Sequence, residues 1–292
     1  MPEGMSEEFA DRYGPWAFIA GAAMGIGAAL SHEAAARGLN VVMVARGAER
    51  LEAAAADVRA RHGVEVRTLA ADLADLSVVD EVAALTADLD VGLVVYNATV
   101  APAGRFADVD LDVHLLSVAV NCATPVALCH HFVPRLSARG RGGLALVSSM
   151  GGTQGAVNFS TYNAGKAFDW ILAESLWAEL HPLGVDVTTM FVGPTSSENY
   201  LAFQATLDRD LCNRPDTDDP LDRARSRLME PDTPEHVATS LYDQLGDGPV
   251  CYPTADDAWI SATCFAMPRR DAVGVWTELQ NTSTRVPEKQ AR

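Results

Sequence analysis

The chain has 292 residues, of which 48% are hydrophobic and 21% charged, a composition typical of a globular protein with a sizeable core and unlike disordered or fibrous chains. Its 39 acidic and 22 basic residues give a formal net charge of -17, which repels phosphate backbones and anionic membrane surfaces. We therefore expect no nucleic acid and no membrane partner. Five widely spaced cysteines form no C-x-x-C pair, so neither a disulfide framework nor a zinc knuckle is predicted.

The sequence shows no targeting segment. Residues Met1 to Glu8 are acidic and polar, unlike the basic and apolar start of a signal peptide, and no apolar run approaches the roughly 18 residues of a membrane span. His130 and His131 are adjacent, so on a helix they point about 100° apart and cannot easily share one ion. We expect a cytoplasmic protein without a metal site.

Short apolar runs alternate with longer alanine-rich stretches, which is typical of βαβ units around a parallel sheet. Strands are predicted at Trp16 to Ala20, Asn40 to Ala45, Glu65 to Ala70, Gly92 to Tyr96, Gly143 to Ser148 and Asp186 to Phe191. Helices are predicted at Gly25 to Arg37, Ala48 to Arg61, Leu76 to Leu89, Asp110 to Ser137, Thr161 to Leu180 and Pro234 to Leu245. The order predicts an α/β fold, a Rossmann-type doubly wound parallel sheet, in a single domain with a core over about residues 14–253.

Two regions interrupt this alternation. Residues 195–232 mix Pro, Asp, Arg and Asn with apolar side chains, a composition suited to a mobile lid over a binding site. Residues 254–292 form a C-terminal extension, predicted to be helical, whose apolar side chains should pack on the same or a neighbouring subunit.

A glycine-rich turn follows the first predicted strand and opens the first predicted helix. Its residues are Gly21, Ala23, Met24, Gly25, Ile26 and Gly27. Glycines allow the chain to turn tightly and allow a pyrophosphate to approach the backbone N–H groups at the positive end of a helix. The same pattern also fits a tight turn without a ligand, and its G-x-x-x-G-x-G spacing differs from G-x-G-x-x-G.

Arg46 stands at the end of the second predicted strand, where no Asp or Glu is present. A carboxylate there would bind a ribose 2′-OH, whereas an arginine pairs with a 2′-phosphate. The residue therefore favours NADP(H) over NAD(H). The alternative is a solvated arginine at a helix start.

Tyr162 and Lys166 are four residues apart, and Ser149 precedes the tyrosine by thirteen. Side chains at i and i+4 of a helix share a face, and a nearby cation lowers the pKa of a phenol from its usual value of about 10. Such a tyrosine can transfer a proton near neutral pH. A plain surface pair has the same spacing.

With the glycine turn, Ser149, Tyr162 and Lys166 in this order, the chain resembles the short-chain dehydrogenase/reductase family, in its short single-domain branch. The resemblance covers roughly Trp16 to Pro253. It implies that Tyr162 is the general acid or base, that Lys166 lowers its pKa and holds the nicotinamide ribose, and that Ser149 binds the substrate carbonyl. It also assigns Asn121 to a water-linked proton relay with Lys166.

The resemblance further implies a set of cofactor contacts. Asp72 and Leu73 match the segment that contacts the adenine, and Gly193, Thr195 and Ser197 match the one that binds the nicotinamide carboxamide, with Val192 in place of a proline. Asn97 and Ala98 match part of the family's Asn-Asn-Ala-Gly, from which Tyr96 and Thr99 depart. Ala20 replaces the usual threonine of the glycine turn.

These residues predict an NADP(H)-dependent oxidoreductase that interconverts a ketone and a secondary alcohol. The expected pocket walls, Met150, Val157, Phe159, Tyr200 and Phe203, are largely apolar, so a hydrophobic small molecule is the expected substrate, unless these side chains serve core or lid packing. Two alternatives are an idle NADP-binding regulator and an epimerase or dehydratase, although the latter usually has a larger C-terminal substrate domain.

Self-association is the last expectation. The helix after Tyr162 carries more apolar side chains than one sheet face needs; they are Phe168, Trp170, Ile171, Leu172, Leu176 and Trp177. The family resemblance implies a homodimer or homotetramer through this helix, while core packing explains much of the same pattern.

Overall fold

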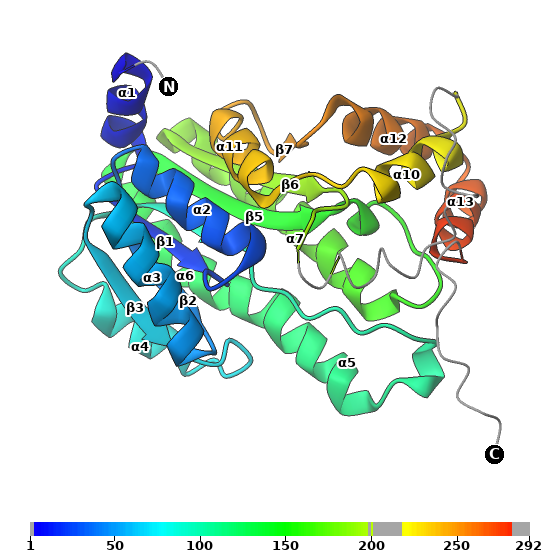
Figure 1. The fold of residues 1–292 in the computed structure, drawn as a ribbon, viewed down its shortest axis with the longest axis horizontal. Helices are drawn as coiled ribbons and strands as arrows, with labels where there is room; N and C mark the ends of the chain where they lie inside the picture. The colour runs from blue at the N-terminus through cyan, green and yellow to red at the C-terminus, as the bar shows by residue number, and fades with distance from the viewer. Residues whose placement is uncertain (1–2, 198–199, 201–217, 282–292) are drawn as a thin grey trace.

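The computed structural model describes residues 3–197, 200 and 218–281. Its centre is one sheet of seven parallel strands in the order β3-β2-β1-β4-β5-β6-β7 (Figure 1). The strands are β1 Trp16–Ala20, β2 Asn40–Ala45, β3 Val66–Ala70, β4 Val91–Tyr96, β5 Gly142–Ser149, β6 Val185–Val192 and β7 Val250–Cys251. The strand order reverses between β1 and β4, the position at which doubly wound sheets bind their ligands. The predicted fold class is confirmed.

Helices cover both faces of the sheet, which explains why the strands are continuous apolar runs. All residues of β1, β4 and β6 are buried. One face packs against α1 Glu3–Tyr13, α2 Gly25–Ala36, α3 Ala48–His62 and α11 Pro234–Asp243. The opposite face packs against α4 Val78–Leu85, α6 Thr124–Arg139 and α7 Ser160–Leu180.

The long helix predicted from Asp110 to Ser137 is helical throughout but is not one uniform α-helix. It comprises α5 Leu111–Val118, a π-helical turn at Ala119–Ala123, and α6. By length and composition the run Leu111–Arg139 could cross a membrane; here Leu128, Phe132 and Leu136 of α6 pack against the sheet, so we interpret it as a core helix.

A third apolar cluster lies beyond the sheet. It contains α10 Pro220–Met229, α12 Ala255–Ala266 and α13 Arg269–Asn281, which gather at the right of Figure 1. Met150 and Phe191 connect this cluster to β5 and β6. The predicted C-terminal helical extension is therefore present over 255–281. Of the predicted lid, residues 198–199 and 201–217 lie outside the described residues, and α10 forms its last part.

Candidate active site

Two cavities meet where the chain leaves β4, and together they contain most of the predicted site residues. The smaller, of about 390 Å³, is lined by Gly21, Ala23, Met24, Arg46, Arg50, Asp72, Leu73 and Ala98. The larger, of about 620 Å³, is lined by Ile26, Ser149, Tyr162, Lys166, Gly193, Thr195 and Ser197. Asn97 and Thr99 line both. Residues at the carboxyl ends of all six strands from β1 to β6 thus border one continuous region.

The glycine turn leaves the start of α2 open. Gly21 and Gly25 have φ angles of 82° and 54°, which side chains rarely adopt. The helix begins after Met24 with no side-chain cap and no acidic residue in its first turn, so its first N–H groups and the positive end of its dipole remain available to an anion. Asn97 Nδ2 donates to the carbonyl oxygen of Gly21 at 3.2 Å and ties this turn to the end of β4.

Gly25 and Gly27 border the turn without lining either cavity. A Cβ placed on Gly27 would lie 1.9 Å from the carbonyl oxygen of Gly21, whereas one on Gly25 would meet only Ser197 Cβ, at 3.8 Å. Gly27 therefore allows close packing of α2 on the turn, and Gly25 provides its left-handed backbone angle.

Two arginines stand at the outer end of the smaller cavity. Arg46 follows β2 and is exposed. Arg50, in the first turn of α3, was not predicted; its Nη1 donates to Met24 Sδ at 3.3 Å. Met24, a predicted cofactor contact, has no charge of its own. Its sulfur contacts the guanidinium of Arg50, which gives the smaller cavity a second basic residue.

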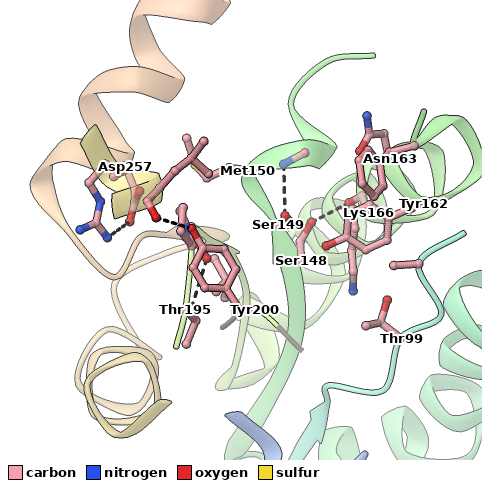
Figure 2. Close-up of a pocket in the computed structure, with 18 of the residues that line it drawn as sticks. Thr99, Ser148, Ser149, Met150, Tyr162, Asn163, Lys166, Thr195, Tyr200 and Asp257 are labelled. Carbon is pink, nitrogen blue, oxygen red and sulfur yellow. Dashed lines mark hydrogen bonds and ion pairs between the residues drawn. The ribbon is translucent and has the colours of Figure 1, made fainter. Parts of the chain in front are cut away.

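Tyr162 and Lys166 lie one turn apart near the start of α7, as their spacing predicts, and both line the larger cavity. Figure 2 shows them on the same side of this cavity as Ser149, opposite Thr195 and Tyr200. The Lys166 side chain is 3% exposed. Its Nζ donates to the Val147 carbonyl oxygen at 2.7 Å and lies 3.2 Å from Asp169 Oδ2.

Ser149 is the last residue of β5, and its backbone is extended. Its Oγ accepts from the Gly151 N–H at 3.2 Å, which leaves the hydroxyl hydrogen free to donate into the cavity. The neighbouring Ser148 donates to the carbonyl oxygen of Lys166 at 2.7 Å. This bond joins the end of β5 to α7 and fixes Ser149 relative to the Tyr162 turn.

Asn121 occupies the π-helical turn and does not line either cavity. Its Oδ1 accepts from the Val100 N–H and its Nδ2 donates to the Val100 carbonyl oxygen, both at 2.8 Å. A Cβ on Gly165 would lie 2.9 Å from Asn121 Cβ, so the π-helical turn packs tightly on α7 beside Lys166. The side chain positions the loop after β4; its part in a proton relay stays a prediction.

The remaining predicted cofactor contacts stabilise local turns. Asp72 Oδ1 accepts from the Ala74 N–H at 3.0 Å after β3. Thr195 Oγ1 donates to the Gly193 carbonyl oxygen at 3.1 Å, and the Ser197 N–H donates to the Thr195 carbonyl oxygen at 2.8 Å. These bonds shape the segment after β6 that borders the larger cavity.

The far wall of the larger cavity includes C-terminal residues that the sequence pattern did not single out. Ile260, Trp276 and Leu279 come from α12 and α13. Arg227 and Asp257 also line this wall, 3.6 Å apart, and Figure 2 shows Asp257 on the side of the cavity away from Tyr162. Burial raises the pKa of Asp257, and Arg227 opposes that shift. Of the expected walls, Met150, Phe159 and Tyr200 line the cavity, Val157 is 40% exposed and does not, and Phe203 lies outside the described residues.

The chain is similar to known proteins in sequence and in fold. The sequence model of the short chain dehydrogenase family matches residues 15–206. The 7beta-hydroxysteroid dehydrogenase of Collinsella aerofaciens is 34% identical over 192 residues, covering 66% of this chain and 73% of that protein. A solved 7beta-hydroxysteroid dehydrogenase structure has a TM-score of 0.80 at 28% identity, covering 91% of this chain and 98% of the other. A short-chain dehydrogenase from Sphingobium yanoikuyae in complex with NADPH has a TM-score of 0.69 at 26% identity, covering 95% and 98%.

Proposed function

Because the chain belongs to the short-chain dehydrogenase family and is an oxidoreductase acting on CH–OH groups, we propose that it interconverts a hydrophobic ketone and its secondary alcohol with NADP(H). The observation that carries the proposal is the pair of adjoining cavities. One has an open helix start and two arginines, the other has Tyr162 and Ser149, and Asn97 and Thr99 border both.

The residues of the smaller cavity fit an NADP(H) nucleotide. The uncapped start of α2 suits the pyrophosphate, and Arg46 and Arg50 suit a 2′-phosphate, since guanidinium groups bind phosphate oxygens in pairs. No carboxylate stands at the end of β2 to bind a free ribose 2′-OH. These charges support NADP(H) over NAD(H).

In the proposed mechanism the nicotinamide, when bound, supplies the hydride to the carbonyl carbon. Ser149 Oγ donates a hydrogen bond to the carbonyl oxygen, and Tyr162 gives that oxygen its hydroxyl proton. Both interactions strengthen as negative charge develops on the oxygen, so they stabilise the transition state more than the bound ketone. The Lys166 ammonium favours the phenolate that Tyr162 leaves behind. In the oxidative direction Tyr162 accepts the proton instead.

The larger cavity supports a bulky, largely apolar substrate. Its volume of about 620 Å³ exceeds what a small carbonyl compound fills, and Met150, Phe159, Ile260, Trp276 and Leu279 contribute apolar surface. The likeness to two 7beta-hydroxysteroid dehydrogenases makes an oxosteroid a suitable test compound for this chain. Arg227 and Asp257 provide a polar spot on an otherwise apolar wall.

The test is NADPH and NADH consumption by the purified protein with ketones of graded size, from acetone through cyclohexanone to a 7-oxosteroid. We expect kcat/KM to rise with the apolar surface of the ketone and to be higher with NADPH than with NADH. Efficient turnover of small charged carbonyl compounds alone would contradict the substrate proposal, and equal use of both cofactors would contradict the NADP(H) preference.

A further inference from the structure

A buried carboxylate lies directly behind the Lys166 ammonium. Asp169 follows Lys166 by three residues on α7, and its side chain is 1% exposed. Its Oδ2 is 3.2 Å from Lys166 Nζ, and its Oδ1 has no hydrogen-bond partner among the described residues. Burying two charges costs hydration free energy, and the attraction between the charges often fails to offset that cost. Stability alone therefore does not account for this pair beside the proposed proton donor.

The groups that share this interior with Asp169 are Tyr96 on β4, Cys122 in the π-helical turn and Cys129 on α6. Burial first, and the Asp169 charge second, raises the pKa of each of the three above its usual value. They are therefore neutral near pH 7. Lys166 and Asp169 form the charged pair at this place, with a net charge close to zero when both are ionised.

Two other titratable groups on elements packed against α7 have partners of their own, one of them on α7 itself. On α5, His114 Nε2 lies 3.0 Å from the Phe106 carbonyl oxygen, and its Nδ1 is hydrogen-bonded to Thr161 Oγ1. On β6, the Asp186 carboxylate binds Arg12 Nε at 2.6 Å. Within the described part of the chain, neither group is hydrogen-bonded or ion-paired to Asp169, Lys166 or Tyr162.

We propose that Asp169 is a positioning residue, which holds the Lys166 ammonium and offsets part of its charge so that Tyr162 keeps its proton to a higher pH than beside an unpaired lysine. An ammonium has three N–H donors, and the Val147 carbonyl oxygen and Asp169 Oδ2 take two of them. The third is left for the cavity side. The proposal rests on the proposed function, in which Tyr162 gives its proton to the ketone oxygen, and it keeps Tyr162 in the protonated form that ketone reduction requires at neutral pH.

Elementary electrostatics gives the direction in which the Tyr162 titration should move when the Asp169 charge is removed. A negative charge raises the pKa of any nearby group that binds a proton, and removing that charge lowers it. Burial raises the pKa of Asp169 to about 6, against the opposing effect of Lys166. Asp169 is therefore ionised above neutral pH while Lys166 is present, and the proposal predicts that a neutral residue at 169 makes Tyr162 more acidic.

The test is a direct titration of Tyr162 by its tyrosinate absorbance, taken as the difference between a protein and the same protein carrying Tyr162→Phe. For Asp169→Asn we expect the Tyr162 titration to move to lower pH by about one unit relative to wild type. The matched control is Glu179→Gln, which removes one exposed carboxylate from the same helix and should leave the titration in place. Asp169→Ser repeats the test with a smaller neutral side chain should the asparagine variant not fold.

A second pair of variants asks whether Asp169 acts through Lys166. When Lys166 is replaced by Met, the buried Asp169 carboxyl loses the counter-ion that keeps it ionised and takes up a proton, so adding Asp169→Asn removes no charge and should no longer move the Tyr162 titration. An equal shift in both backgrounds, or no shift beyond that of Glu179→Gln, would overturn the proposal. The proposal would also be overturned if Asp169→Asn and Asp169→Ser both failed to fold while the double variant Lys166→Met/Asp169→Asn folded. That result would mean that Asp169 is needed only to neutralise the buried lysine for stability. The titration needs no turnover, so failure to reduce any ketone would contradict the proposed function and leave this result readable.

Discussion

Tyr162 depends on its neighbours for the proton transfer proposed for it. Lys166 lies one helical turn from Tyr162, and the buried Asp169 lies 3.2 Å from the Lys166 ammonium. Ser149 Oγ accepts from the Gly151 N–H. The proposed chemistry is therefore set by a small number of side chains on β5 and α7.

Tyr162→Phe should lose most turnover while retaining the cofactor. The substitution removes the proton donor but leaves the ring, so kcat for ketone reduction is expected to fall about 100- to 10,000-fold, with NADPH affinity changed by less than about threefold. Steady-state kinetics and NADPH fluorescence titration measure the two quantities. Turnover close to wild type would show that another group donates the proton.

Arg46 and Arg50 should decide between the two nicotinamide cofactors. A hydrogen bond between charged groups contributes about 1.5–3 kcal/mol, so Arg46→Ala is expected to weaken NADPH binding about 10- to 100-fold, and Arg50→Ala should weaken it in the same direction. NADH affinity should stay unchanged, because NADH has no 2′-phosphate.

Arg141→Ala, at an exposed arginine outside both cavities, is the matched control for calorimetric titration of the two cofactors. If NADPH and NADH binding fell equally in Arg46→Ala, the residue would act on the shared part of the nucleotide.

Residues joined by regular spacing could be predicted from the sequence, and residues joined by packing could not. The i, i+4 spacing places Tyr162 beside Lys166 whatever the rest of the fold. Arg50 lines the smaller cavity with its guanidinium against Met24 Sδ, a contact between residues 26 positions apart. Asp169 follows Lys166 at i+3, but its burial depends on the packing of α7 against β5.

At the scale of elements, the turn between β1 and α2 combines an anion site with close packing. Gly21 provides the left-handed backbone angle, and the first N–H groups of α2 remain uncapped. Gly27 allows α2 to pack closely against this turn, since a Cβ there would lie 1.9 Å from the Gly21 carbonyl oxygen. The shape of the nucleotide cavity therefore depends on a glycine that does not line it.

Gly27→Ala should lower stability and cofactor affinity together. Backbone atoms cannot rotate away from the added methyl group, so overpacking should cost about 1–3 kcal/mol or more, and NADPH binding should weaken because the turn moves. Thermal unfolding with and without NADPH measures both effects. Gly274→Ala is the control: it lies in α13 with no neighbouring atom within 4 Å, so it should stabilise by about 1 kcal/mol. Unchanged unfolding of Gly27→Ala would contradict the packing argument.

The six longer strands were predicted to within about one residue. In β1, β2, β4, β5 and β6 burial on both faces leaves a strong sequence signal, whereas β3 is a partly exposed edge strand. The two-residue β7 is too short to produce such a signal. The terminal helix α1 was also missed; its start is acidic and polar, and its buried contacts come from Phe9 and Tyr13. The π-helical turn has no spacing that distinguishes it from the α-helix around it.

At the scale of the whole molecule, exposed apolar side chains on neighbouring helices support the predicted self-association. Phe168 and Ile171 on α7 are 37% and 53% exposed, and Leu115 and Val118 on α5 are 55% and 45% exposed. By contrast, Leu172, Leu176 and Trp177, which were also read as interface candidates, pack against the core. The apolar pattern of this helix therefore did not distinguish side chains that pack in the core from exposed side chains that could form a subunit interface.

Ile171→Glu should disrupt the proposed homo-oligomer. Wild type is expected to be a dimer or tetramer by light scattering after size exclusion, and the buried charge in the variant should shift it toward monomer. Leu76→Glu, at a residue that is 50% exposed near α4, should leave the mass unchanged. A monomeric wild type at micromolar concentration would contradict the proposal.

The cavity wall formed by α10, α12 and α13 has a consequence for how such a protein can change. Ser149, Tyr162, Lys166 and the two arginines all precede residue 206, where the family match ends, whereas Ile260, Trp276 and Leu279 follow it. The proposed cofactor and proton-donor residues thus lie in the first part of the chain, whereas the substrate cavity also takes wall residues from that part, Met150 and Phe159. We expect that exchanging the segment after residue 206 for that of a relative would alter substrate preference while the cofactor and the proton donor stayed as they were.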